Sequence, residues 1–477
     1  MIRSIASFLC FITAITSTVV HAQDLNDVIE SSNNTEAFWS VTVRDAEGEI
    51  LFERNSDKLF IPASNQKLYT LGAVLHYLGK DFRYETVLKS PGFQEGDTWK
   101  GDIIIRGSGD PSISGFLYEE NRYYVFESWY QQLKEQGINR IEGDLIGDIS
   151  YFDDQNYPVG WDWYDLSFYY GVEIAPLSFN NNTVDLEVFA EGDVGARPVI
   201  RWFPDSTDYV DFINEQLILP ENREYDEYYR RDPGTNRIIL RSGLPRGYYE
   251  TESLSVHDAG TYFVDSFKDF IRKKGIEWIG NRRTEKYAES RGNYKTLARH
   301  LSRPMSDLLT WANKESDNFY TEMFLKTLHA ELSGEPGSFE GGIELVKAFL
   351  AETATDTSYV IMRDGSGLAY GNFTTTSNLS HYLSEIRNRE YYDTLYESLP
   401  VAGIDGTIAY RMKDTPLYRN FRGKTGYMSG VRALSGYLTT KKGKDIIVSI
   451  ATNNFAGKVK PVDQTHEQIL LYLYENY

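Results

Sequence analysis

Strand patterns at both ends of this 477-residue chain constrain its fold most strongly. Residues 37–44 (AFWSVTVR) and 49–53 (EILFE) are strand-forming runs joined by a short turn, which predicts a β-hairpin. Residues 432–439 and 445–452 flank a Lys-Lys-Gly-Lys turn and predict a second hairpin, and a helix is expected over residues 462–475. We therefore expect both chain ends to contribute strands to one sheet that has helices packed on it.

A long segment with a different sequence pattern interrupts this arrangement between about residues 82 and 256. It consists of short alternating runs and turns, with one helical pattern over residues 124–136. Helical patterns return after it, at residues 262–274, 304–332, 341–353 and 378–388. Because 477 residues are too many for one ordinary core, two or three domains are expected. The interrupting segment is therefore interpreted as one or two small β-rich domains inserted into a larger one.

The helix expected within residues 61–80 (IPASNQKLYTLGAVLHYLGK) carries the first candidate site. Its apolar residues recur at spacings of three and four, which predicts an amphipathic helix that begins at or just before Ser64 and ends near Gly79. Ser64 and Lys67 then lie one turn apart, about 4.5 Å along the helix axis. A lysine that burial keeps partly neutral can take the proton of such a serine and make it a nucleophile. Because a lone Ser-x-x-Lys arises by chance about once or twice in a chain of this length, the motif needs partners elsewhere.

Two further short motifs supply candidate partners. Ser316-Asp317-Asn318 lies within the helical stretch 304–332, whereas three other Ser-x-Asn triplets lie in no helical context. Lys424-Thr425-Gly426 occurs once, directly before the C-terminal hairpin. A phosphate-binding loop is excluded for this Gly-Lys-Thr, because Tyr418 stands where the first glycine of such a loop is required. Taken alone, Lys424 could equally be a solvated lysine at the start of a strand.

The order of the three motifs is typical of the active-site serine penicillin-recognising enzymes. Six surrounding stretches narrow this resemblance: GDPSIS (109–114), GDLIGDISYFDD (143–154), GWDWYDL (160–166), SFNNN (178–182), DGSGLAYGN (364–372) and LPVAGIDGTIAYR (399–411). Each is similar to a stretch of the class C low-molecular-mass penicillin-binding proteins, which are D-alanyl-D-alanine carboxypeptidase/endopeptidases. The similarity extends from about residue 37 to residue 440.

The resemblance implies an α+β fold with a transpeptidase/β-lactamase-like catalytic domain. This domain has a five-stranded antiparallel sheet with helices on both faces, and two smaller β-rich domains are inserted after its Ser-x-x-Lys helix. We expect the following boundaries: a signal peptide at 1–22, the catalytic domain at 23–85 and 257–477, inserted domain II at 86–175 and 235–256, and inserted domain III at 176–234.

The resemblance also implies acyl transfer through a serine ester. Ser64 would attack the carbonyl between two D-alanines of a peptidoglycan stem peptide, or a D-alanyl cross-link. Lys67 would be the general base, which requires burial and a nearby cation such as Lys424 to lower its pKa. Ser316 would relay a proton to the leaving amine. Asn318 would bind the peptide chain of the substrate and hold Lys67.

The implied substrate-binding residues lie mainly on the strand that carries Lys-Thr-Gly. Thr425, together with Lys424, would face the terminal carboxylate, and Gly426 would let the substrate backbone approach the strand. The oxyanion hole would consist of the backbone N–H groups of Ser64 and Tyr427. Asp148 is the expected acidic residue that receives the free amine of the stem diamino acid. Met428 is a possible wall of that pocket. For Asp148, a simple strand-end turn residue is an equally good interpretation.

Two positions depart from the pattern of the resembled family. Tyr427 replaces the Thr or Ser that usually follows Lys-Thr-Gly, and Ala369-Tyr370 replace the Ser-Arg that commonly follows DGSGL. Both changes affect the subsite for the terminal carboxylate, and they favour endopeptidase activity slightly.

Residues 1–22 are interpreted as a secretory signal peptide, and no later stretch is apolar enough for a transmembrane anchor. The single cysteine, Cys10, lies within that segment, so we expect no disulfide in the mature protein. A formal net charge of −20 makes nucleic-acid binding improbable. The histidines show no ligand spacing, so no metal and no cofactor are expected. The expected partners are peptidoglycan peptides and β-lactams, at a periplasmic or cell-surface bacterial location. The sequence does not indicate the oligomeric state.

Two alternatives to a DD-peptidase remain open at this point. A β-lactamase or esterase would use the same serine chemistry, but no dedicated water-activating residue is identifiable in the sequence. A non-catalytic protein that binds muropeptides or β-lactams could retain the fold, although the intact set of motif residues argues against it.

Overall fold

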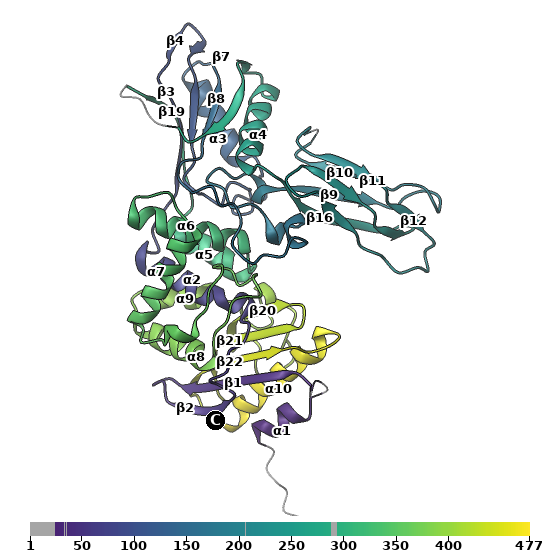
Figure 1. Ribbon diagram of the computed structural model, residues 1–477, viewed down its shortest axis with the longest axis vertical. Coiled ribbons are helices and arrows are strands. Elements are labelled where there is room, and N and C mark those ends of the chain that lie inside the picture. Colours follow the sequence, from purple (N-terminus) through teal and green to yellow (C-terminus); the bar gives the residue numbers. More distant parts are fainter. Residues whose placement is uncertain (1–23, 33, 35, 206, 288–292) are drawn as a thin grey trace, which may run out of the picture.

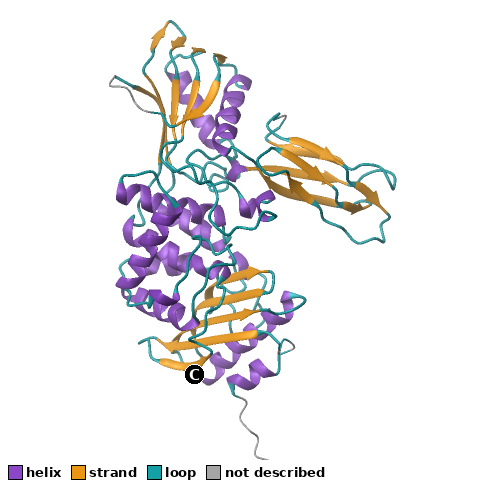
Figure 2. Ribbon diagram, in the orientation of Figure 1, coloured by secondary structure: helices purple, strands orange, loops and turns teal. Residues whose placement is uncertain are grey.

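The computed structural model describes residues 24–32, 34, 36–205, 207–287 and 293–477, so the expected signal peptide lies outside the described residues. Figure 1 shows a main domain that contains helices and one sheet, with two smaller lobes beside each other at its far end. We call them the upper lobe (residues 85–148 and 259–301) and the lateral lobe (residues 183–255). Strands dominate both lobes, as Figure 2 shows, and the main domain holds most of the helices.

The main-domain sheet combines both ends of the chain, as the sequence predicts. Its strand order is β2-β1-β22-β21-β20, and every neighbouring pair is antiparallel. The strands are β1 (Phe38–Asp45), β2 (Ile50–Arg54), β20 (Arg422–Met428), β21 (Val431–Thr439) and β22 (Asp445–Asn453). Strand β20, which carries the Lys-Thr-Gly motif, is therefore an edge strand of this sheet.

Alternation along β1 explains why helices cover both faces of the sheet. Val41 and Val43 point into a core that includes residues of α1 (Leu25–Glu30) and α10 (Val459–Asn476). Ser40 and Thr42 point to the opposite face, where both hydroxyl groups bond to that of Thr376 on α8 (Thr376–Glu385), at 2.7 and 2.8 Å. The expected α+β architecture with helices on both faces is confirmed.

The helical body of the main domain surrounds α2 (Lys67–Tyr77), whose residues are buried on almost every side. Its other helices are α5 (Met305–Lys314), α6 (Asn318–Ser333), α7 (Phe339–Glu352) and α9 (Tyr392–Ser398). The prediction of a single helix over residues 304–332 is wrong, because the helix is interrupted between α5 and α6. Ser316 has a φ of +60°, and Asp317 caps α6 by accepting a hydrogen bond from the backbone N–H of Tyr320 at 3.0 Å.

The upper lobe contains two sheets and two long helices. One sheet has the order β18-β8-β6-β3-β19 and the other the order β17-β7-β5-β4. The first comprises β3 (Glu85–Ser90), β6 (Ile103–Arg106), β8 (Leu145–Asp148), β18 (Arg282–Glu285) and β19 (Lys295–Leu301). The second comprises β4 (Phe93–Glu95), β5 (Thr98–Lys100), β7 (Arg140–Glu142) and β17 (Glu277–Ile279), and the helices are α3 (Tyr124–Glu135) and α4 (Ala259–Lys273).

The lateral lobe consists of three small sheets, with orders β10-β9-β16, β11-β14-β13 and β12-β15. Its strands are β9 (Thr183–Phe189), β10 (Val199–Phe203), β11 (Asp211–Asn214), β12 (Leu217–Leu219), β13 (Tyr229–Arg231), β14 (Arg237–Leu240), β15 (Gly243–Pro245) and β16 (Tyr249–Ser255). Its apolar side chains share one core with those of the upper lobe.

Strand pairing differs from the expected domain boundaries in two places. Residues 257–301, which we expected in the catalytic domain, contain β17, β18 and β19, and these strands pair with β7, β8 and β3 of the upper lobe. Residues 235–256, which we expected in domain II, contain β16, which pairs with β9 of the lateral lobe. Helical periodicity in residues 262–274 shows which face is buried but not which sheet covers it. We therefore propose the two lobes as defined above in place of the expected domains II and III.

Candidate active site

Ser64 and Lys67 lie where the chain enters α2. Residues Ala63–Gln66 form a 3₁₀ turn, and α2 continues directly from it, so the predicted one-turn spacing is realised. The Nζ atom of Lys67 lies 3.0 Å from the Oγ atom of Ser64. It also donates hydrogen bonds to the Oδ1 atom of Asn318 at 2.6 Å and to the carbonyl oxygen of Ser366 at 2.8 Å.

The environment of Lys67 lowers the pKa of its amine. Its side chain is completely buried, and this burial lowers the pKa of Lys67 to about 8. The negative charges of Asp364, Glu322 and Asp317 oppose the decrease but do not cancel it. About one tenth of the Lys67 amine is therefore neutral at pH 7 and able to accept a proton from Ser64.

Lys424 approaches the site from the edge strand β20. Its Nζ atom donates a hydrogen bond to the Oγ atom of Ser316 at 2.7 Å. Burial lowers the pKa of Lys424 well below its ordinary value, and the positive charges of Lys67 and Arg432 lower it further. The solvated-lysine interpretation of Lys424 is wrong, because its side chain is completely buried.

A cavity of about 920 Å³ opens above these groups. Its lining includes six of the predicted site residues: Ser64, Ser316, Asn318, Thr425, Tyr427 and Met428. Gly426 lies between two of them, and a Cβ atom at this position would come within 2.6 Å of the carbonyl oxygen of Pro62. A glycine is therefore required for β20 to approach the turn that carries Ser64.

Asp148 does not belong to this cavity, so its predicted role in the site is wrong. It lies on β8 of the upper lobe, and its carboxylate accepts backbone N–H bonds from Ser150 at 3.0 Å and Tyr287 at 3.2 Å. The alternative interpretation as a strand-end residue is correct. Two other carboxylates line the cavity instead, Asp162 and Asp165. Burial raises the pKa of Asp165, and the neighbouring charge of Asp162 raises it further.

The acidic pair of the cavity was missed although it lies in the stretch GWDWYDL, which contributed to the family resemblance. That stretch contains no regular strand or α-helix, so no periodicity indicates where its side chains point. The available signal for a site was the presence of two carboxylates among four aromatic and apolar neighbours in this stretch.

Glu322 is a further buried residue that sequence reasoning missed. Its carboxylate accepts backbone N–H bonds from Gly365, at 3.0 and 3.1 Å, and from Ser366 at 2.7 Å. These bonds orient the carbonyl oxygen of Ser366 toward Lys67. Burial, together with the charge of Asp364, raises the pKa of Glu322 to about 8.

A serine bonded to a buried lysine, beside an amide and a second buried lysine at the edge of an antiparallel sheet, is the arrangement of an active-site serine enzyme. Over residues 21–471 the chain matches the model of the D-Ala-D-Ala carboxypeptidase 3 (S13) family, and it belongs to this family. The family membership expected from the three motifs is confirmed.

The following relatives match nearly the whole length of the chain. The D-alanyl-D-alanine carboxypeptidase DacB of Haemophilus influenzae is 28% identical over 473 residues, which cover 96% of this chain and 94% of the relative. The crystal structure of penicillin binding protein 4 (dacB) from Haemophilus influenzae has a TM-score of 0.85 and 26% identity, and the match covers 95% of this chain and 100% of that chain. The structure of that protein complexed with a novel β-lactam has a TM-score of 0.79 and 25% identity, with the same coverage of both chains.

Within the described part of the chain, no helix combines the length and the apolar composition needed to cross a membrane. The same residues contain no group of three or more histidine, cysteine, aspartate or glutamate side chains suited to hold a metal ion.

Proposed function

We propose that the protein is a serine DD-peptidase that hydrolyses the D-Ala-D-Ala bond, or the D-alanyl cross-link, of peptidoglycan stem peptides. The observation that carries this proposal is the 3.0 Å contact between Ser64 and a buried Lys67 inside a cavity large enough for a peptide. The names and the β-lactam complex of its relatives support the same substrate class. Metal and cofactor have no part in the proposed chemistry.

In the first step, neutral Lys67 takes the hydroxyl proton of Ser64 as its oxygen attacks the substrate carbonyl carbon. The developing oxyanion would bind the backbone N–H groups of Ser64 and Tyr427, each worth about 3–4 kcal/mol of transition-state stabilisation. The carbon–nitrogen bond then breaks, and the leaving amine receives a proton through Ser316. The bond from Lys424 to Ser316 at 2.7 Å supports this route, because it orients the Ser316 hydroxyl. Water finally hydrolyses the Ser64 ester.

Substrate recognition would use both ends of the cavity. At β20, Thr425 would meet the terminal carboxylate. Arg432 also lines the cavity, but its guanidinium is paired with Asp463 at 2.6 and 3.0 Å. At the other wall, Asp165 and Asp162 would receive the free amine of the stem diamino acid, in the role first expected of Asp148. Asp165 is half-buried in the wall of the cavity, so its attraction to an amine is screened less than it would be in bulk water.

Two finer points of function are also proposals. The substrate class implies action at a cell wall, which agrees with the expected export of the protein to a periplasmic or cell-surface location. β-Lactams would acylate Ser64, and the resulting ester would be hydrolysed slowly. This slow hydrolysis would distinguish the protein from a β-lactamase. Hydrolysis itself would distinguish it from a protein that only binds muropeptides.

Digestion of defined muropeptides tests the proposal. Purified protein is incubated with a monomeric pentapeptide muropeptide and with a D-alanyl-cross-linked dimer, and the products are separated by liquid chromatography. We expect release of D-alanine, of monomers, or of both, and no product from Ser64→Ala or from protein that penicillin has blocked beforehand. Turnover that persists in Ser64→Ala would overturn the proposal.

A further inference from the structure

One wall of the active-site cavity is a segment without a regular strand or α-helix. Residues 156–173 connect the upper lobe to the lateral lobe, and their only regular elements are two 3₁₀ turns, Asp165–Ser167 and Tyr169–Gly171. Five residues of this segment line the cavity: Asp162, Tyr164, Asp165, Tyr169 and Tyr170. Because a segment of this kind makes few hydrogen bonds of its own, its shape depends on groups that reach it from elsewhere.

The lateral lobe supplies the central anchor, Arg231 at the end of β13. This side chain is buried, and its Nη2 atom donates a hydrogen bond to the carbonyl oxygen of Leu166 at 2.9 Å. Its backbone N–H donates to the hydroxyl group of Ser167 at 3.1 Å. The hydroxyl group of Ser255 on β16 accepts from the Nε atom of Arg231 and donates to the same Leu166 carbonyl. All these bonds converge on the residues that directly follow Asp165.

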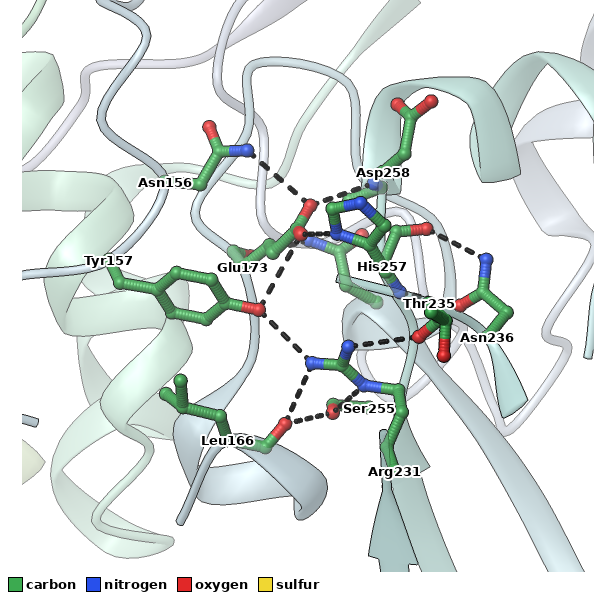
Figure 3. A network of polar contacts seen from close by, with 12 residues as sticks. Asn156, Tyr157, Leu166, Glu173, Arg231, Thr235, Asn236, Ser255, His257 and Asp258 are labelled. Carbon is green, nitrogen blue, oxygen red and sulfur yellow. Dashed lines mark hydrogen bonds and ion pairs between the residues drawn. The ribbon is translucent and has the colours of Figure 1, made fainter. Parts of the chain in front are cut away.

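Glu173 fixes the C-terminal end of the same segment, as Figure 3 shows. Its side chain is 1% exposed, and it accepts hydrogen bonds from the Nδ1 atom of His257 at 2.7 Å and from the backbone N–H of Ala259 at 3.0 Å. The hydroxyl group of Tyr157 lies between the two anchors: it accepts from Arg231 at 3.2 Å and donates to Glu173 at 3.5 Å. Arg231 and Glu173 are thus joined through one phenol rather than by direct contact.

The main domain holds the opposite side of the segment. The Nδ2 atom of Asn318 donates a hydrogen bond to the carbonyl oxygen of Tyr170 at 2.9 Å, while its Oδ1 atom accepts a hydrogen bond from the Nζ atom of Lys67. The indole N–H of Trp161 donates to Asp364 at 2.9 Å. The segment therefore spans the distance between the Ser–Lys site and the lateral lobe.

We propose that Arg231 is a positioning residue through which the lateral lobe fixes Asp165 against the substrate. The inference rests on the proposed function, since Asp165 is taken to receive the side-chain amine of the stem peptide. Arg231 touches neither the substrate nor Ser64. Its side chain holds the carbonyl oxygen of Leu166, the residue that follows Asp165 in the turn. The bond to Ser167 comes from the backbone N–H and is retained in Arg231→Met.

The test compares three reactions in wild type and in Arg231→Met. The probes are a stem peptide with a free side-chain amine, the same peptide with that amine acetylated, and a fluorescent penicillin that reports acylation of Ser64. Arg230→Met is the matched control, because Arg230 is the preceding residue of β13 and pairs with Asp232 on the surface of the lobe. Ser255→Ala removes the other side-chain donor to the Leu166 carbonyl, which also accepts from Arg231, so it gives a second and milder variant.

For Arg231→Met we expect kcat/KM for the free-amine peptide to fall about tenfold through KM, which is the scale of one charge-assisted hydrogen bond. The acetylated peptide and the penicillin should change by less than about twofold, and Arg230→Met should match wild type. If Arg231→Met does not fold, Ser255→Ala decides by the same comparison, because it removes the other side-chain donor to the Leu166 carbonyl.

An equal loss with all three probes, or no loss with any, would overturn the inference. Failure of the proposed function would be different, because wild-type protein would then hydrolyse neither peptide.

Discussion

The buried amine of Lys67 makes acylation of Ser64 depend on pH in a way that the structure predicts. With the pKa of Lys67 lowered to about 8, about one amine in ten is neutral at pH 7 and about nine in ten at pH 9. The neutral amine is the base, so the acylation rate rises with pH. We expect the second-order rate constant for a penicillin to increase about tenfold between pH 7 and pH 9 and then to level off.

An ordinary lysine would give a different curve. With its pKa at 10.5, the neutral fraction would still rise about a hundredfold between pH 7 and pH 9, without levelling off below about pH 10. The measurement is the rate of labelling by a fluorescent penicillin from pH 6 to pH 10, with circular dichroism at each pH to show that the protein stays folded. A rate that is constant over this range, or that falls as pH rises, would refute the assignment of Lys67 as the base.

Three substitutions test other parts of the site. Glu322→Ala leaves two buried backbone N–H groups without an acceptor, so the free energy of unfolding in urea should fall by about 3 kcal/mol; a change below about 1 kcal/mol would contradict this account. Gly426→Ala places a Cβ atom 2.6 Å from the carbonyl oxygen of Pro62, and we expect about 2 kcal/mol of destabilisation together with slower penicillin labelling. Wild-type labelling by this variant would show that β20 does not need its close approach. Asn318→Ala removes an acceptor 2.6 Å from Lys67, and the acylation rate should fall about a hundredfold, whereas a loss of less than about threefold would show that Lys67 is held by other groups.

Local patterns in the sequence predict the parts of the site that lie on regular elements. The spacing of Ser64 and Lys67 needs only a helical turn, and the structure has that turn. Lys424 needs only a strand at the edge of the sheet, and β20 is that strand. The break at Ser316 was not predicted, because the apolar periodicity of residues 304–332 continues through it. The available signal was Asp317, a good helix cap that lies where the periodicity predicts a helix interior.

Long-range pairing and irregular segments account for the errors. Asp148 ends a strand and Asp165 lies in an irregular segment, and neither pattern shows which carboxylate faces the cavity. Only the tertiary structure shows that Asp165 lines it, whereas Asp148 accepts hydrogen bonds from backbone N–H groups. Likewise, β17, β18 and β19 complete sheets whose other strands precede them by more than 100 residues. No local period encodes such partners, so the boundaries of the inserted lobes could not be read from the sequence.

The central claim is that Ser64 is the nucleophile, and covalent labelling tests it most directly. The protein is incubated with labelled penicillin, digested, and mapped by mass spectrometry. The account predicts a single labelled peptide that contains Ser64, and no label in Ser64→Ala. A label on any other residue, or a label that persists in Ser64→Ala, would contradict it.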